Sequence, residues 1–176
     1  MRTLAHSLKA WLAFTLIAGL AFPLAVWLFG ALFYPQKANG SLVLRDGQAV
    51  GSRLLAQKTT GDRYVHPRPS AGDYATTPSA ASNAGWTDKA LRQRLASLPH
   101  TPEDASQSAS GLDPDITPES AAWQLQKVAK ARGWSETSRK KAEEWIASNT
   151  QGGIISPPYV NVLQLNLAID LIPDGK

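Results

Sequence analysis

Residues 10–34 read AWLAFTLIAGLAFPLAVWLFGALFY, an apolar run of 25 residues without a formal charge. An α-helix rises about 1.5 Å per residue, so this run would extend over about 38 Å, more than the roughly 30 Å hydrocarbon core of a bilayer. Gly19 and Pro23 interrupt the run, and membrane-spanning helices tolerate both residue types better than soluble helices do. The run therefore predicts a transmembrane helix at positions 10–34. Its expected aromatic anchors at the headgroup level are Trp11, Trp27 and Tyr34.

Two other interpretations of this run are a cleaved signal peptide and a buried helix of a soluble protein. A signal peptide has an apolar core of roughly 7–15 residues followed by small residues at the cleavage site. This run is longer and ends in Leu32-Phe33-Tyr34-Pro35, which are bulky. A buried helix would have to be shielded from solvent on every face. We therefore favour an uncleaved membrane anchor.

The charges that flank the run predict its orientation. Arg2, Lys9 and the amino terminus precede the run, whereas only Lys37 follows it within ten residues. Lys and Arg near the ends of a span favour the cytoplasmic side. We expect residues 1–9 in the cytoplasm and residues 35–176 on the other side of the membrane, which in a bacterium would be the inner membrane and the periplasm.

The overall charge excludes several functional classes. The chain carries 18 Lys and Arg against 14 Asp and Glu, and its isoelectric point is about 9.5. Without Arg2 and Lys9 the excess falls to two, which is too small for a nucleic-acid-binding face. The chain has no cysteine, which excludes disulfides, a thiolate nucleophile and Cys-ligated metals. The apolar run argues against a plain cytosolic enzyme.

The part after the run is predicted to fold as one mixed α+β domain. Residues 41–50 indicate a hairpin, because Asp46-Gly47 between apolar runs suits a tight turn. Residues 59–85 are rich in Gly, Pro, Ser and Thr, which is typical of a linker or a loop. We favour a loop packed on the domain surface, since Tyr64, Tyr74 and Trp86 would be costly in a flexible linker.

Three helices follow in the prediction. Thr87 is the expected N-cap of the first, whose apolar face would hold Leu91, Leu95 and Leu98 before Pro99 stops it. Residues 101–110 are polar and expected to be mobile. Thr117 and Pro118 should begin a second helix that Gly133 ends, and Ser135 should cap a third. The expected inward-facing residues of these two helices are Ala121, Leu125, Val128, Ala129, Ala142, Trp145 and Ile146.

The last apolar block is residues 159–172. Leu163, Leu165, Leu167, Ile169 and Leu171 alternate with more polar residues, and a period of two predicts a strand with one buried face. A helix from Asn166 onward is the alternative for its final residues.

Catalytic signatures are missing from the sequence. There is no Gly-x-Ser-x-Gly elbow, no Walker loop, no dinucleotide-binding fingerprint and no His-Glu-x-x-His. The histidines His6, His66 and His100 are scattered. Residues 126–135, with basic residues around them, resemble a DNA-reading helix-turn-helix, but the predicted orientation places them outside the cell. Two packed helices with solvated basic faces explain this pattern better.

Seven short stretches follow one another in an order that is typical of one protein family. They are Ala38-Asn39-Gly40-Ser41, Gly51-Ser52-x-Leu54, Tyr64-x-His66-x-Arg68-Pro69-Ser70-Ala71, Ser82-Asn83, Ser108-Ala109-Ser110-Gly111-Leu112-Asp113-Pro114, Val128-Ala129-x-Ala131-Arg132-Gly133 and Val160-Asn161-Val162-Leu163-x-Leu165-Asn166-Leu167-Ala168. On these stretches, which cover nearly the whole chain, it resembles the C subunit of the bacterial Kdp system, a high-affinity ATP-driven potassium importer. The chain departs from the family at Val65-His66-Pro67, where the family has Phe-x-Gly, and at Ala80-Ala81, where the family has Gly-Gly.

This resemblance implies a non-catalytic accessory subunit that binds no cofactor of its own. Its implied partners are a potassium-channel-like subunit and a P-type ATPase subunit, where potassium and ATP act. The family is described as a catalytic chaperone that raises the ATP affinity of the hydrolysing subunit. Because ATP is cytoplasmic and the domain is predicted to be periplasmic, we expect this effect to be indirect.

The loops that match the family supply the candidate interface residues. These are Arg68, Pro69, Ser70, Tyr74, Ser82, Asn83, Ser110, Gly111, Leu112, Asp113 and Pro114. The alternative function is a membrane-anchored periplasmic hydrolase using Asp113, Asp115 or His66, and a signalling protein is a third possibility. The lack of a nucleophile beside a base argues against the hydrolase.

Overall fold

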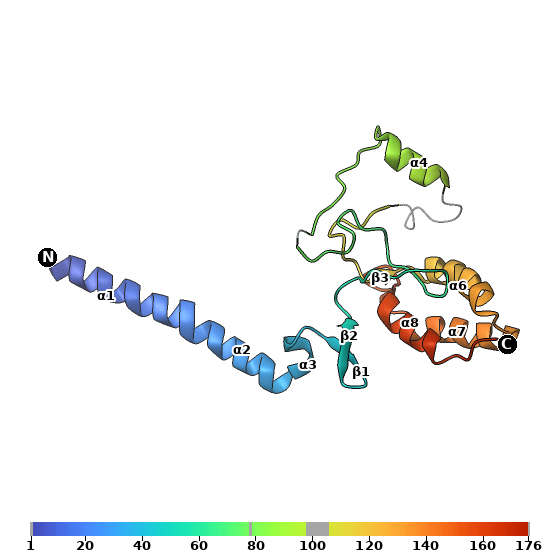
Figure 1. Cartoon of the computed structure of the whole chain (residues 1–176). Coiled ribbons are helices and arrows are strands. Elements are labelled where there is room, and N and C mark those ends of the chain that lie inside the picture. The colour runs from blue at the N-terminus through green and yellow to red at the C-terminus, as the bar shows by residue number, and fades with distance from the viewer. Residues whose placement is uncertain (1, 78, 98–105, 176) are drawn as a thin grey trace. The chain divides into compact units, whose positions relative to one another are not determined.

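The computed structural model describes residues 2–77, 79–97 and 106–175 (Figure 1). The chain divides into two compact units, Met1–Leu42 and Val43–Lys176.

The first unit is almost entirely one long helix. It runs through α1 (Arg2–Leu16), η1 (Ile17–Ala21) and α2 (Phe22–Phe33), and the short helix α3 (Pro35–Ala38) follows (Figure 1). Among the described residues, the stretch Arg2–Phe33 is the one helix long and apolar enough to cross a membrane, judged by length and composition. None of its apolar window is buried within the protein, and Trp11, Trp27 and Tyr34 are all exposed.

A widened turn, η1, lies directly before Pro23. The Phe22 N–H donates to the carbonyl of Ile17, five residues back instead of four. Proline has no N–H, and its ring collides with the carbonyl four residues earlier, here that of Gly19. A single π-turn is a common way to relieve this conflict without breaking a helix. The helix therefore continues through Pro23, as a spanning helix requires.

The predicted hairpin of β1 (Leu42–Arg45) and β2 (Gln48–Ser52) is present, and all of it after Leu42 belongs to the second unit. Asp46 and Gly47 form the turn with φ values of +52° and +78°. Two successive left-handed residues match the twist of the flanking strands. The hairpin prediction is confirmed.

Two of the three predicted helices have the expected caps. Helix α6 (Pro118–Arg132) begins where Thr117 Oγ1 accepts from the Ser120 N–H, and it ends at Gly133 with φ +62°. Helix α7 (Glu136–Asn149) begins where Ser135 accepts from the Ser138 N–H. Both start and stop signals are local, so the sequence was sufficient to place these helices.

Helix α4 (Lys89–Ser97) is present but has a different cap. Asp88, not Thr87, accepts from the Leu91 N–H, at 3.0 Å. Of the predicted apolar face, Leu91 and Leu95 are half-buried, while Leu98 and Pro99 lie outside the described residues.

The predicted strand at residues 159–172 is wrong. Only β4 (Val160–Asn161) is extended, and it pairs antiparallel with β3 (Asp115–Ile116). Helix α8 (Val162–Asp170) follows, capped by Asn161, whose Oδ1 accepts from the Gln164 N–H at 3.2 Å. The alternative helix from Asn166 onward has the right type but begins four residues too late. Apolar residues at nearly every second position satisfy a helical period as well, and the buried ones are Val162, Leu165 and Ile169.

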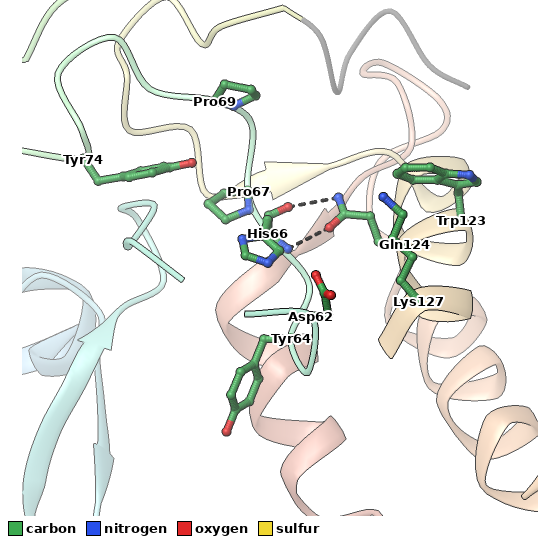
Figure 2. A pocket seen from close by; sticks show the side chains of 9 residues that line it. All are labelled: Asp62, Tyr64, His66, Pro67, Pro69, Tyr74, Trp123, Gln124 and Lys127. Carbon is green, nitrogen blue, oxygen red and sulfur yellow. Dashed lines mark hydrogen bonds between the residues drawn. The ribbon is translucent and has the colours of Figure 1, made fainter. Parts of the chain in front are cut away.

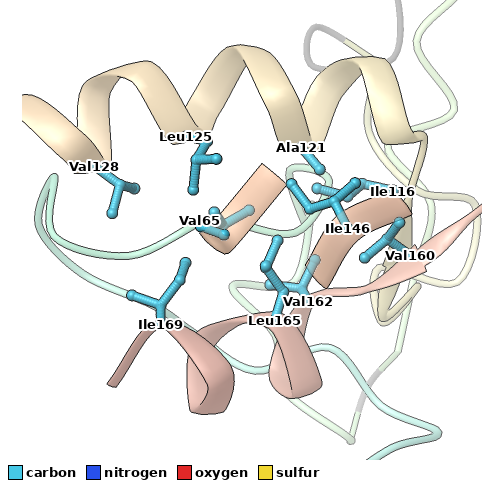
Figure 3. Packing of buried hydrophobic residues seen from close by; sticks show 11 residues of the cluster. Val65, Ile116, Ala121, Leu125, Val128, Ile146, Val160, Val162, Leu165 and Ile169 are labelled. Carbon is cyan, nitrogen blue, oxygen red and sulfur yellow. The ribbon is translucent and has the colours of Figure 1, made fainter. Parts of the chain in front are cut away.

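The core of the second unit is built mostly from branched aliphatic side chains of α6, α7, α8 and the β3–β4 pair (Figure 3). Its buried members are Val65, Ile116, Ala121, Leu125, Val128, Ala142, Ile146, Val160, Val162, Leu165 and Ile169. Of the predicted inward-facing residues, Ala129 and Trp145 are only half-buried. Val65 is the one core member supplied by a long loop.

The loop prediction for residues 59–85 is confirmed at its start and wrong at its end. Val65 is fully buried, and Tyr64 and Tyr74 are half-buried. Trp86, in contrast, is 84% exposed, so its presence was no evidence of packing.

Candidate functional site

Two side-chain amides hold the Val65–His66 backbone from opposite sides. Gln124 accepts from the His66 N–H at 2.8 Å and donates to the His66 carbonyl at 3.1 Å (Figure 2). Asn166 accepts from the Val65 N–H at 2.9 Å and donates to the Val65 carbonyl at 2.8 Å. Each amide reproduces the paired donor and acceptor of a neighbouring β-strand. The two amides therefore hold Val65 in the core. They also fix the start of the loop that contains Pro67, Arg68 and Pro69, called the Arg68 loop below.

The Arg68 loop and the 108–114 loop meet through an ion pair. Arg68 Nη1 lies 3.3 Å from Asp113 Oδ2, and Nη2 lies 3.1 Å from Ser106 Oγ. The side chains of Arg68 and Asp113 are 25% and 35% exposed. An ion pair of this exposure contributes at most about 1 kcal/mol. Pro67 and Pro69 restrict the backbone on both sides of Arg68. Arg68 and Asp113 thus brace each other across two loops.

Ser108 organises the second loop from inside. It is 1% exposed, and its Oγ accepts from the Gly111 N–H at 3.0 Å and the Asp113 N–H at 3.3 Å. Its own N–H donates to the Pro69 carbonyl at 3.0 Å, which joins the two loops a second time. The predicted mobility of residues 101–110 is therefore wrong at Ser108, while residues 101–105 lie outside the described residues.

Gly111 lies in close contact with neighbouring loop residues. Its φ is +72°, and an added Cβ would lie 3.0 Å from Ser70 Oγ and 3.1 Å from the Ala80 carbonyl oxygen. Ser70 Oγ also accepts from the Tyr74 N–H, and the Tyr74 hydroxyl donates to the Arg68 carbonyl at 3.1 Å. Burial, together with the nearby Asp73 carboxylate, raises the pKa of Tyr74, so the hydroxyl stays protonated as a donor.

Most of the predicted interface residues lie where the Arg68 loop and the 108–114 loop meet. Leu112 and Pro114 connect the junction to the rest of the domain. The Leu112 carbonyl accepts from the Ala56 N–H and the Pro114 carbonyl accepts from the Val162 N–H, each at 2.9 Å. Ser110 Oγ accepts from the Leu112 N–H. Ser82 and Asn83 are exposed and are not partners in these bonds, although Ser82 lines a separate surface hollow with Gln107. We use "loop junction" for Arg68, Pro69, Ser70, Tyr74, Ser108, Ser110, Gly111, Leu112, Asp113 and Pro114.

An open groove of about 310 Å³ borders the loop junction (Figure 2). Its lining residues are Asp62, Tyr64, His66, Pro67, Pro69, Tyr74, Trp123, Gln124 and Lys127. Lys127 Nζ lies 3.9 Å from the centre of the Trp123 ring, a cation–π contact across one helical turn. Sequence reasoning missed Trp123, Gln124 and Lys127. The available signal in the sequence was a Trp four residues before a Lys within the helix that Thr117 caps.

The three residues proposed for the alternative hydrolase, His66, Asp113 and Asp115, each bind another group of the same chain. His66 Nε2 lies 2.9 Å from the Gly61 carbonyl oxygen, and Asp113 binds Arg68. Asp115 accepts from the Asn161 amide at 2.9 Å. Burial raises the pKa of Asp115 and the Asn161 hydrogen bond opposes that rise, while the Asp113 charge adds to it. Within the described ranges, no group of three or more His, Asp or Glu side chains could hold a metal. The geometry therefore gives a hydrolase little support.

A buried arginine ties the chain's C-terminal segment to α6. Arg132, whose side chain is 4% exposed, binds Asp170 at 2.9 Å, Asp174 at 3.4 Å and the Arg63 carbonyl at 2.8 Å. Arg45 of β1 binds the other oxygen of Asp170. Burial alone would raise the pKa of Asp170, but hydrogen bonds from Arg132, Tyr64 and Arg45 outweigh it and hold the pKa below its ordinary value. Arg132 is thus unavailable to DNA, which favours two packed helices over a helix-turn-helix reader.

Comparisons with known proteins agree on one family. The profile of the family described as "K+-transporting ATPase, c chain" matches residues 4–171. The chain is similar to the potassium-transporting ATPase KdpC subunit of Rhodopseudomonas palustris strain BisB18, with 42% identity over 90% of this chain and 92% of the relative. It is 41% identical to the subunit of the same name from Pseudomonas aeruginosa strain PAO1, with 96% of each chain covered. The Rhodospirillum rubrum subunit is 40% identical over 97% of this chain.

Proposed function

Because the chain belongs to the family of C chains of potassium-transporting ATPases, we propose that it is a non-catalytic subunit that stabilises the complex and assists its ATP-hydrolysing subunit. The observation that supports this most is the match over residues 4–171, which includes both the long apolar helix and the loop junction. The polar side chains of the junction bind one another and the backbone, which holds both loops in one shape. ATP hydrolysis then belongs to a partner.

The proposed partners are a potassium-channel-like subunit and a P-type ATPase subunit, with potassium and ATP acting in the assembled complex. Any effect of this chain on ATP affinity would be a coupling free energy transmitted through the complex. We propose the topology that the flanking charges favour: residues 1–9 in the cytoplasm, residues 10–34 across the bacterial inner membrane and residues 35–176 in the periplasm.

Removal of the gene tests the subunit assignment directly. A deletion strain should fail to grow at micromolar external potassium and should grow normally at millimolar potassium, where other uptake routes suffice. Growth curves across a potassium series provide the measurement, and a plasmid-borne copy of the gene provides the control. Normal growth of the deletion strain in scarce potassium would remove the basis for this assignment.

A single cysteine tests the topology. Ser148 on α7 is exposed, and the natural chain has no cysteine, so Ser148→Cys introduces one reporter with little change in volume. In cells with a permeabilised outer membrane, it should react with a membrane-impermeant maleimide. The control is Ser7→Cys, which lies before the apolar run and should react only after the inner membrane is broken. The reverse pattern would place the domain in the cytoplasm.

Arg68 and Asp113 test whether the loop junction contacts a partner. Arg68→Ala should cost the fold only about 1 kcal/mol, because the pair is partly exposed. If the guanidinium also binds a partner, the loss of copurification should be much greater for Arg68→Ala than for Asp113→Ala. Thermal melts of the fragment Val43–Lys176, run beside pull-downs of the full complex, separate the two effects. Equal losses for both variants would show that Arg68 acts only by bracing its own loop.

A further inference from the structure

The loop of residues 151–159 is closed at its base by a two-residue bridge. Gln151 and Tyr159 exchange two backbone hydrogen bonds of 2.9 Å each. The Tyr159 hydroxyl donates to Gln151 Oε1 at 3.2 Å, which reinforces the same closure. Nearer the tip, the Gly153 N–H donates to the Ser156 carbonyl at 2.7 Å. The loop is therefore a defined turn connecting α7 to β4.

Its glycines and prolines restrict the loop to this shape. Gly152 and Gly153 have φ values of +81° and +98°, which favour glycine. A Cβ on Gly152 would also collide with the Pro157 carbonyl oxygen. Pro157 and Pro158 fix φ on the returning side. Little conformational entropy remains to be lost when such a loop binds a partner.

The tip of this loop carries two adjacent isoleucines in full contact with solvent. Ile154 is 98% exposed and Ile155 is 101% exposed. Single exposed apolar residues are common, but a neighbouring pair held at the tip of a braced turn is not explained by the fold. The surrounding sequence is neutral, since residues 145–169 contain no charged side chain.

We propose that this loop is an apolar anchor that inserts Ile154 and Ile155 into an apolar pocket on another subunit of the same potassium-transporting complex. The inference rests on the proposed function. Two isoleucines bury far less than the roughly 1,600 Å² of a stable interface between free proteins, so the loop cannot hold a second copy of this chain or a diffusing partner by itself. A partner kept nearby by a shared membrane and by other contacts needs only such a local anchor, because its effective concentration is high.

The neutrality of the loop favours a protein pocket over lipid. Loops and helices that bind a bilayer surface combine apolar residues with Lys or Arg for the headgroups. No basic residue lies within residues 145–169, and the tip has no aromatic ring. An uncharged aliphatic tip instead matches the desolvated centre of a protein interface.

A spin label at the tip tests the occupant. Ile155→Cys is labelled in the purified full chain, which has no other cysteine, and its mobility is compared in lipid nanodiscs with and without the other subunits. The label should be mobile with the chain alone and immobilised in the complex. The matched control is Leu171→Cys, an apolar position that is 82% exposed beyond the end of α8 and should remain mobile in both. Immobilisation in nanodiscs without other subunits would identify lipid as the occupant. A label that stays mobile in both samples would exclude any occupant. Either result overturns the proposal.

Substitution measures the anchor's contribution. The double variant Ile154→Ser, Ile155→Ser should weaken retention of this chain in the detergent-solubilised complex at least about tenfold, while Leu171→Ser leaves it unchanged. Because both isoleucines are exposed, the thermal melt of the chain should not change. If the wild-type chain itself does not copurify with the other subunits, the proposed function is overturned. If the wild type copurifies and the double variant is retained equally, the docking inference alone is overturned.

Discussion

Replacing Gln124 by leucine is expected to lower the free energy of unfolding of the fragment Val43–Lys176 by about 2–4 kcal/mol. The variant keeps a side chain of similar size but removes the partners of both the His66 N–H and the His66 carbonyl. A fully buried polar group without a partner costs about 1–3 kcal/mol, and this change leaves two groups that are only partly buried, so we expect the lower part of the summed range. Urea denaturation followed by circular dichroism provides the measurement.

Gln126→Leu is the matched control for this prediction. Gln126 lies on the same helix, two residues further along, and is exposed, so its replacement should change the free energy of unfolding by no more than about 0.5 kcal/mol. Asn166→Leu should behave like Gln124→Leu, because it removes both partners of Val65. The double variant should cost less than the sum, since either change alone releases the same segment. A Gln124→Leu variant as stable as Gln126→Leu would contradict this account.

Arg132→Met should lower the free energy of unfolding by about 3 kcal/mol, the scale for removing one partner from a buried ion pair. Methionine retains much of the apolar stem, but Asp170 loses its strongest partner and the Arg63 carbonyl loses its donor. Asp170 keeps Arg45, so the fold should survive. Lys130→Met on the exposed face of α6 is the control and should cost little.

The pH dependence of stability gives a second measurement at the same site. The pKa of Asp170 is lower in the folded chain than its ordinary value of 3.8. The stability that this carboxylate contributes is therefore fully present above about pH 3.8 and is lost as the pH falls through the folded pKa. Arg132→Met should reduce this acid-dependent loss. The raised pKa of Asp115 acts in the opposite direction and is common to both proteins, so it cancels in the comparison. An unchanged slope below pH 4 in the variant would show that Arg132 does not set the pKa of Asp170.

Local signals explain which elements could be predicted from the sequence. The long apolar helix, the hairpin at Asp46-Gly47 and the helices capped by Thr117 and Ser135 depend on residues within a few positions of each other. The block after Val160 could not be assigned in the same way, because its spaced apolar residues fit both the period of a strand and the period of a helix. Packing of Leu165 and Ile169 against α7 and the rest of the core decides the outcome, and the Asn161 cap was the missed local signal.

In the candidate site, too, local motifs identified single residues but could not predict which residues pair. The family-like loops identified Arg68 and Asp113, but their pairing joins residues 45 positions apart, which neither loop sequence encodes. The hydrogen bond between Gln124 and His66 joins residues 58 positions apart, and no local pattern predicts that pairing either. The groove-lining residues Trp123 and Lys127 lie outside the inward-facing stripe that the sequence predicts for α6, so no local pattern assigns them to a groove. Only the fold brings the outer face of α6 beside the loop.

The amides of Gln124 and Asn166 also protect the folded chain against aggregation by strand addition. A lone extended segment normally offers a row of unsatisfied N–H and C=O groups, onto which a strand from another molecule can add and begin aggregation. At Val65 and His66 these groups are bound by the Asn166 and Gln124 side chains on either side. A side chain, unlike a strand, ends there and presents no further row of backbone groups. The backbone groups of this segment are therefore satisfied like those of a central strand, and no strand from another molecule can add to it.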